Sequence, residues 1–133
     1  MRRVLLGLVT VLAVVAAVIL GHLALIEVGR EVVTLRTQRS DGTWQKTRPW
    51  IADVAGTPWL HSGGAKWLAR FAGDPVVELE RAGEVRSYRA HAAPGPHPEL
   101  DRALREKYGV ADRWVRFIAP DGPDTVAVRL DPP

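Results

Sequence analysis

Hydrophobic residues are arranged in two ways along this chain. From Val4 to Ile26 they form an apolar run without a charged residue, VLLGLVTVLAVVAAVILGHLALI. As a helix rising about 1.5 Å per residue, this run is long enough to cross the hydrocarbon core of a bilayer. Beyond it, apolar and polar residues alternate in short stretches, as in strands with one buried face. The pattern predicts a short basic tail (1–3), a transmembrane anchor helix (4–26) and a folded domain (27–133).

A cleaved secretory signal is the alternative interpretation of the apolar run, because Arg2 and Arg3 precede it. The run is longer than the roughly 7–15 apolar residues of a typical signal, and His22-Leu23-Ala24 is a poor cleavage site. We therefore favour an uncleaved, single-pass anchor in the cell membrane. Its orientation stays open, because basic residues flank the run on both sides, with Arg30, Arg36 and Arg39 following it.

The rest of the chain predicts a mainly β domain with short helices. Strands are expected over 31–38, 43–53, 57–61, 75–81, 84–91 and 125–130, and helices over 65–72, 99–108 and 110–118. Asp41-Gly42 indicates a hairpin turn, and Pro49 indicates an edge or a bulge in the second strand. Read as β-β-β-α-β-β-α-β, the order suggests a small barrel or a rolled sheet.

Charge and composition exclude several classes of protein. All 15 acidic residues lie at or after Glu27, and only Arg2 and Arg3 of the 18 basic residues precede it. The domain is therefore almost neutral. With no Lys/Arg run to follow a nucleic-acid backbone, no nucleic acid is expected as a partner. The absence of cysteine excludes disulfides, thiolate metal sites and cysteine nucleophiles.

Familiar catalytic motifs do not occur in the sequence. His61, His91 and His97 have no helical i, i+4 pairing with carboxylates, so no metal site is predicted, and His97 is expected to be solvated between prolines. No nucleophile elbow surrounds Ser62, and no dinucleotide-binding glycine motif follows a strand. The catalytic residues therefore stay unknown, and Tyr88 and His61 are candidate acids by their chemistry alone.

One region suggests a ligand site. Its residues combine positive charge, small residues at a strand-to-helix junction and aromatic rings: Arg48, Trp50, Ser62, Gly63, Gly64, Lys66 and Trp67. Glycine lets backbone N–H groups approach a ligand closely, and cationic side chains pair with phosphate. Tryptophan can stack on a flat ring. The alternative is that the glycines form a plain loop, Lys66 is solvated and the tryptophans belong to the core.

The segment TRPWIADVAGTPWLHSGGAKWLARFAGDPVVELE, residues 47–80, resembles the pyridoxamine-phosphate-oxidase-like split β-barrels. An arginine-bearing strand, a short strand, a loop of small residues, a helix and an Asp-Pro step follow each other in the family order. The preceding stretch VTLRTQRSDGTWQKTRP is similar to the opening hairpin of the deazaflavin (F420)-dependent nitroreductase branch. The chain departs from the family after His91 and at Trp67, where a smaller or polar residue is more usual.

The resemblance implies a split β-barrel of the FMN-binding kind that dimerises and holds FMN or a deazaflavin (F420) near the dimer groove. Arg48, Ser62 and Lys66 would then hold the cofactor phosphate, with Trp50 and the Gly63-Gly64 backbone beside the ring. The expected function is a membrane-anchored, nitroreductase-like oxidoreductase acting on a hydrophobic or quinone-like substrate. The alternatives are a non-enzymatic module that binds a small ligand or a partner on the same barrel, and a structural membrane accessory.

Overall fold

The computed structural model describes residues 1–123 and 125–133, apart from the side chains at positions 2, 3, 26, 27, 62, 63 and 65. The chain divides into two compact units, Met1–Arg30 and Glu31–Pro133. The first unit is the helix α1, Arg2–Glu27. Within it, Val4–Leu25 has a mean hydropathy of 2.9 and is long and apolar enough to cross a membrane. A signal sequence near an N-terminus meets the same criterion.

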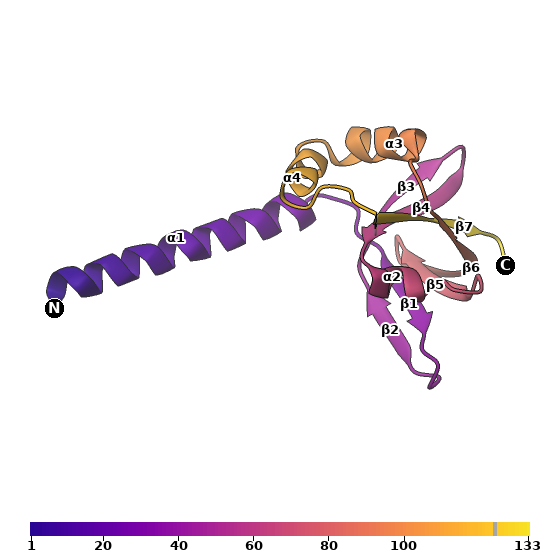
Figure 1. Cartoon of the computed structure of the whole chain (residues 1–133), viewed down its shortest axis with the longest axis horizontal. Coiled ribbons are helices and arrows are strands. Elements are labelled where there is room, and N and C mark those ends of the chain that lie inside the picture. Colours follow the sequence, from indigo (N-terminus) through magenta and orange to yellow (C-terminus); the bar gives the residue numbers. More distant parts are fainter. Residues whose placement is uncertain (124) are drawn as a thin grey trace. The chain divides into compact units, whose positions relative to one another are not determined.

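The second unit is built on one antiparallel sheet (Figure 1). Its strands are β1 Thr34–Gln38, β2 Trp44–Thr47, β3 Trp50–Val54, β4 Thr57–Gly63, β5 Val76–Arg81, β6 Glu84–Ala93 and β7 Thr125–Asp131. Their order across the sheet is β2-β1-β5-β6-β7-β4-β3. Two hairpins turn at Ala-Gly pairs in which both residues have positive φ, Ala55-Gly56 and Ala82-Gly83, as tight two-residue hairpins require.

Pro49 explains why this sheet is rolled. The two edge strands, β2 and β3, are consecutive in the chain and are separated only by Arg48 and Pro49. Proline lacks the N–H that a continuous strand would use, so β2 ends and pairs with β1 while β3 pairs with β4. Since two residues span only a few ångströms, the opposite edges of the sheet must meet at this point, which closes it into a split barrel.

Side-chain alternation assigns the two faces of the barrel wall. Ile51 and Leu60 are fully buried in the hydrophobic core, so Trp50 and His61, one position away on the same strands, lie on the outer face. The core consists of Val33, Leu35, Ile51, Leu60, Val77, Leu79, Ala90, Val128 and Leu130, with Trp67 and Phe71 from and after α2, Ala65–Ala69.

Two helices cover part of the outer face. The helix α3, Pro98–Tyr108, begins with Pro98, carries acidic residues in its first turn and basic residues in its last, and buries Leu100, Leu104 and Tyr108. It packs against β3 and is followed at Gly109, whose φ is +53°, by α4, Val110–Ile118 (Figure 1). The positive φ of Gly109 ends α3 and lets the chain turn into α4.

Most predicted elements occur in the structure, with two corrections. The predicted strand 43–53 is two strands, β2 and β3, that lie at opposite edges of the sheet. Four strands rather than three therefore precede the helix α2. The predicted helix 65–72 ends at Ala69, and Gly73 and Asp74 follow with positive φ.

The prediction that His97 is solvated is wrong: its Nε2 lies 2.9 Å from the Ala93 carbonyl, and its ring lies beside Trp59.

Candidate functional site

The β3–β4 hairpin brings several of the predicted site residues to one end. Its register pairs Trp50 with His61. Arg48 lies two residues before Trp50, and Gly63 lies two residues after His61, so both come out of the hairpin at the same end. Gly64 follows with φ +105°, a conformation open to glycine but strained for other residues. Lys66, two residues after Gly64, is exposed on α2, and Arg48 is exposed as well.

The structure separates the two tryptophans assigned to this site. Trp67 is only 7% exposed and packs edge-to-face on Phe71 inside the barrel, with the ring centroids 4.9 Å apart. Trp50 lies on the outer face, on the other side of the wall. Ser62 was also predicted here, but its side chain lies outside the described part of the chain. Arg48, Gly64 and Lys66 therefore share one end of the hairpin, Trp50 adjoins it, and Trp67 is a core residue.

Trp50 forms one wall of a cavity on the outer face. Its ring stacks on that of Tyr108, with the centroids 4.3 Å apart and the planes 5° from parallel. The cavity beside it has a volume of about 270 Å³. Besides Trp50 it is lined by His61 and Thr125 from the sheet, by Asp112, Val115 and Arg116 from α4, and by Ala119, Pro120 and Asp121 after α4. The ring of Trp50 is thus presented to a hollow between the sheet and α4.

Arg116 is the centre of a charged cluster in this cavity. Its guanidinium donates to Asp112 at 3.0 Å, to Asp101 at 2.9 Å and to Asp121 at 2.5 Å. Burial opposes the charge on Arg116, yet the hydrogen bonds to Asp101 and Asp112 outweigh it and raise the pKa of the guanidinium. Asp112 itself is almost fully buried. The cluster fixes α4 against α3 and the sheet through charged hydrogen bonds.

His61 adjoins this cluster. Its Nε2 lies 3.4 Å from Asp121. Burial lowers the pKa of His61; the nearby Asp121 acts in the opposite direction, and Arg116 adds to the lowering. The imidazole is therefore mainly neutral at pH 7, and it faces both the Trp50 cavity and a second hollow of about 400 Å³ beside His97 and Asp101.

A cluster able to hold a cation was missed by the sequence analysis. One ligand atom from each of His61, Asp101 and Asp121 lies within 4.8 Å of the others. The residues come from β4, α3 and the loop after α4, so no local spacing connects them. Arg116 already pairs with both carboxylates, which makes the cluster an ion-pair network rather than an open set of metal ligands.

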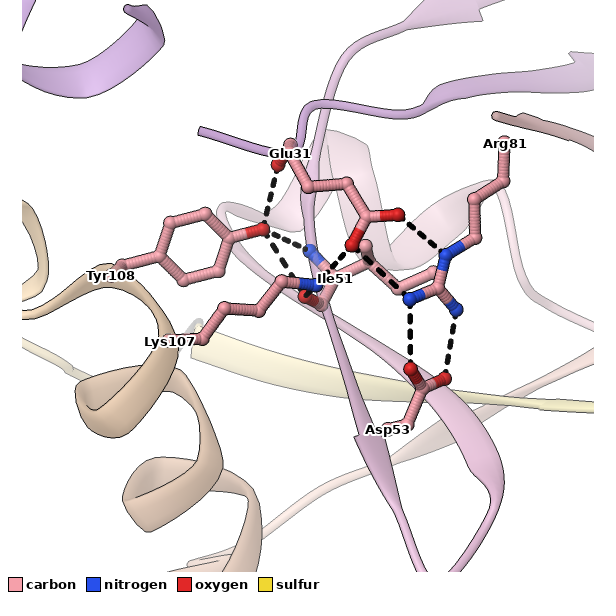
Figure 2. Close-up of polar contacts among 6 residues, drawn as sticks. All are labelled: Glu31, Ile51, Asp53, Arg81, Lys107 and Tyr108. Atoms are coloured by element: carbon pink, nitrogen blue, oxygen red, sulfur yellow. Dashed lines mark hydrogen bonds and ion pairs between the residues drawn. The ribbon is translucent and has the colours of Figure 1, made fainter. Parts of the chain in front are cut away.

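A second polar network joins the start of the domain to α3 and β5 (Figure 2). Arg81 donates to Glu31 at 2.6 Å and to Asp53 at 2.7 Å. The hydrogen bond from Arg81 is the main reason why the pKa of each carboxyl is lowered. Lys107 also pairs with Glu31 and donates to the Ile51 carbonyl at 2.7 Å. These contacts fix the residue at which the folded domain begins.

The two candidate acids lie in different surroundings. Tyr88 packs against the barrel core and lines a hollow with Leu79 and Arg81, whereas His61 lies on the outer face. Tyr108, which the sequence analysis did not single out, contacts the Trp50 ring. Its hydroxyl accepts a 3.1 Å hydrogen bond from the Ile51 N–H and donates to the Glu31 carbonyl at 2.8 Å. The aromatic stack of Trp50 and Tyr108 is therefore held in place by backbone hydrogen bonds.

Known structures provide the comparison for the fold. Heme storage protein HutZ from Vibrio cholerae superposes with a TM-score of 0.61 at 13% identity, over 79% of this chain and 83% of its own. General stress protein 26 from Bacillus anthracis gives 0.55 at 15% identity, over 84% and 87%. A putative pyridoxamine 5′-phosphate oxidase from Listeria innocua gives 0.53 at 16% identity, over 83% and 89%.

These similarities show the fold: the domain is a mainly β split barrel of the pyridoxamine-phosphate-oxidase-like type, as the sequence predicts. No protein-family model matches the chain, and no curated protein matches it. Proteins that share the fold include oxidase-type members and heme-binding members. The fold thus occurs in proteins of more than one function, and the choice among them depends on the site.

Proposed function

We propose that this protein is a membrane-anchored oxidoreductase that binds a flavin-type cofactor, either FMN or a deazaflavin (F420). The observation that carries the proposal is the meeting of Arg48, Gly64 and Lys66 at one end of the β3–β4 hairpin, beside the cavity lined by Trp50. Cationic side chains and an open glycine backbone suit a phosphate, and an indole ring suits a flat heterocycle. The two halves of such a cofactor therefore have matching surfaces side by side.

The residues fit the cofactor in distinct roles. Arg48 and Lys66 would pair with its phosphate, with the Ser62 hydroxyl and the Gly63-Gly64 backbone as further donors. Trp50 would lie beside its ring system. Trp67 would act from within the core, where it anchors α2, the helix that carries Lys66. When bound, the cofactor supplies hydride transfer, and the protein holds and orients it.

A homodimer would complete this site. Arg48 and Lys66 are exposed, and the Trp50 cavity of about 270 Å³ is small for a whole cofactor compared with ligand pockets of roughly 300–1,000 Å³. The resemblance to split barrels implies a cofactor near a dimer groove. A second copy covering the exposed end of the hairpin would enclose the ring while leaving the phosphate on Arg48 and Lys66.

The anchor explains the class of substrate that we propose. A helix spanning Val4–Leu25 would hold the domain at the bilayer surface, where hydrophobic and quinone-like molecules are concentrated. Reduced flavin and deazaflavin are expected mainly in the cytoplasm. The enzyme function therefore requires the domain inside the cell, with the start of the helix outside.

A non-enzymatic binding module is the second candidate, and a specific observation favours it. Two of the described groups near Trp50 that can exchange a proton are already engaged in structural contacts. The Tyr108 hydroxyl bonds to the backbone of Glu31 and Ile51, and His61 lies against Asp121 in the Arg116 cluster. A protein with this cavity can hold a flat ligand without catalysing a proton transfer.

Fluorescence of the full chain in lipid nanodiscs tests the proposal. Oxidised FMN or deazaflavin is added, and tryptophan emission is followed. Binding beside Trp50 should quench the emission, and Trp50→Phe should remove much of that quenching. No quenching by either cofactor at roughly tens of micromolar would contradict the proposal. Binding without turnover of a quinone by the reduced cofactor would favour the second candidate.

A further inference from the structure

The helix α4 has its amphipathic faces reversed relative to a helix that packs on a core. Its charged residues Asp112 and Arg116 point inward, where Asp112 is almost fully buried. Four of its five large apolar residues point outward: Val110, Trp114, Phe117 and Ile118 are all exposed, Phe117 to 79%. Their spacing of i, i+4, i+7 and i+8 places them on one side of the helix. We call these four residues the α4 apolar face.

The α4 apolar face lies close to the point where the domain is attached to the N-terminal helix. Tyr108, two residues before α4, donates its hydroxyl hydrogen to the carbonyl of Glu31, the first residue of the domain (Figure 2). Lys107 pairs with the Glu31 side chain as well. At about 1.5 Å per residue, the nine residues of α4 extend only about 14 Å from there.

Chain length limits how far this face can be from a bilayer. The candidate span ends at Leu25, and the domain begins at Glu31. Six residues, even fully extended at about 3.3–3.6 Å each, cover roughly 20 Å. If the span crosses a membrane, Glu31 and the neighbouring start of α4 therefore remain within about that distance of the hydrocarbon core.

We propose that the α4 apolar face docks on the lipid bilayer to which the N-terminal helix anchors the domain. An indole and a phenyl ring beside aliphatic residues, next to exposed Arg113, match the composition of helices that lie in the headgroup region. Trp114 and Phe117 lie with their ring centroids 6.2 Å apart, so they enter the interface as one unit. This inference rests on the membrane anchoring in the proposed function.

Docking would bring the candidate site to the lipid surface. The inward side of α4 supplies Asp112, Val115 and Arg116 to the cavity beside Trp50, and its outward side is the α4 apolar face. The width of one helix would thus separate the cavity from the bilayer. A lipid-dissolved substrate would reach the cavity along α4 without crossing bulk water.

Single spin labels on the full chain test the docking. The chain has no cysteine, so Ile118→Cys and Val76→Cys each introduce one thiol. The two positions are matched in exposure, at 48% and 46%, and Val76 is at the end of β5 opposite Arg81, which contacts Glu31. In vesicles of phosphatidylcholine with some phosphatidylglycerol, the label at 118 should collide more with oxygen and less with a water-soluble nickel chelate than the label at 76. Adding Phe117→Glu should abolish this difference.

The possible failures are distinguishable. A chain that floats with the vesicles but shows equal collision rates at both labels overturns the docking and leaves the anchoring intact. A chain that does not float overturns both. Protection at 118 that increases with the protein-to-lipid ratio means that a second copy covers the α4 apolar face, and this also overturns docking on lipid. None of these results depends on cofactor binding, which the fluorescence titration measures separately.

Discussion

The Tyr108 hydroxyl donates a 2.8 Å hydrogen bond to the backbone carbonyl of Glu31, 77 positions earlier in the chain. This contact links the last turn of α3 to the first residue of the domain. The ring of the same tyrosine stacks on Trp50, which lines the candidate cofactor cavity. The position of the first residue of the domain and the wall of the candidate site therefore both depend on one side chain.

Removing the Tyr108 hydroxyl should destabilise the domain. Tyr108→Phe keeps the ring stack but leaves the buried Ile51 N–H without its 3.1 Å partner, at a cost of about 1–3 kcal/mol in unfolding free energy. Denaturant unfolding followed by near-UV circular dichroism measures this. The only other tyrosine, Tyr88, provides the matched control, since Tyr88→Phe removes a hydroxyl whose neighbour Arg86 is exposed. A Tyr108→Phe domain that loses no more stability than the Tyr88→Phe domain would contradict this expectation.

The Arg81 network should make the unfolding free energy of the domain depend on pH. Hydrogen bonds from Arg81 lower the pKa of Glu31 and Asp53 below the ordinary values of 4.5 and 3.8. Carboxyls whose pKa is lowered in the folded state stabilise it above those ordinary values, and this contribution is lost as the pH falls through the folded values. The unfolding free energy should therefore decrease below about pH 4.5, and less steeply in Arg81→Gln. Arg86→Gln, which removes an exposed arginine, should leave the slope unchanged.

Breaking the Arg116 cluster should be costly. Arg116→Met leaves Asp112, which is almost fully buried, without its cation, and we expect a loss of about 3 kcal/mol, the low end for buried pairs because Arg116 is partly exposed. Asp112→Asn in the same chain should restore part of the loss. Arg113→Met, on the exposed side of the same helix, is the control. A double variant no more stable than Arg116→Met would disprove the pairing.

His61 provides an independent readout of the same cluster. Arg116 helps to lower the pKa of His61, while Asp121, Asp101 and Asp112 act to raise it. Arg116→Met should therefore raise the His61 pKa, because the carboxylates remain and the cation is gone. The imidazole resonances in an NMR titration report this value. A pKa that falls or stays constant would contradict the assigned surroundings of His61.

Local pattern was enough to predict most of the elements. The alternation of apolar and polar residues over 75–91 predicted β5 and β6. Glycine and proline residues at the boundaries predicted α3 and α4. The run 43–53 was predicted as one strand because both of its halves have strand character. Only the missing N–H of Pro49, together with the pairing of each half, shows that they belong to opposite edges of the sheet.

The candidate site was only partly predictable, for two physical reasons. The sequence does not show whether a tryptophan faces the inside or the outside of the barrel wall. Trp50 and Trp67 were therefore assigned to the same site, although Trp67 is in the core. The Arg116 cluster joins β4, α3 and the loop after α4, and such contacts depend on tertiary packing. In contrast, Arg48, Gly64 and Lys66 are close in sequence to one hairpin, and its register brings them to the same end.

The side of the membrane is open to direct test. The enzyme function requires the domain in the cytoplasm, so a reporter fused after Pro133 should be active inside the cell and silent outside. Fluorescent protein and alkaline phosphatase fusions give opposite signals on the two sides. An outward-facing domain would favour the binding module over the oxidoreductase.

The affinity of the full chain for FMN and for riboflavin tests the central claim most directly, because the two ligands share the ring and differ by the phosphate. We predict that FMN binds more tightly, and that Arg48→Ala and Lys66→Ala each weaken FMN binding by about 1–3 kcal/mol while leaving riboflavin binding unchanged. Arg102→Ala, which removes an exposed arginine on α3, should alter neither affinity. If F420 is the cofactor, the same two variants should weaken its binding to the same extent. Unchanged affinity of both variants for both cofactors would contradict the claim that this end of the hairpin holds a phosphate.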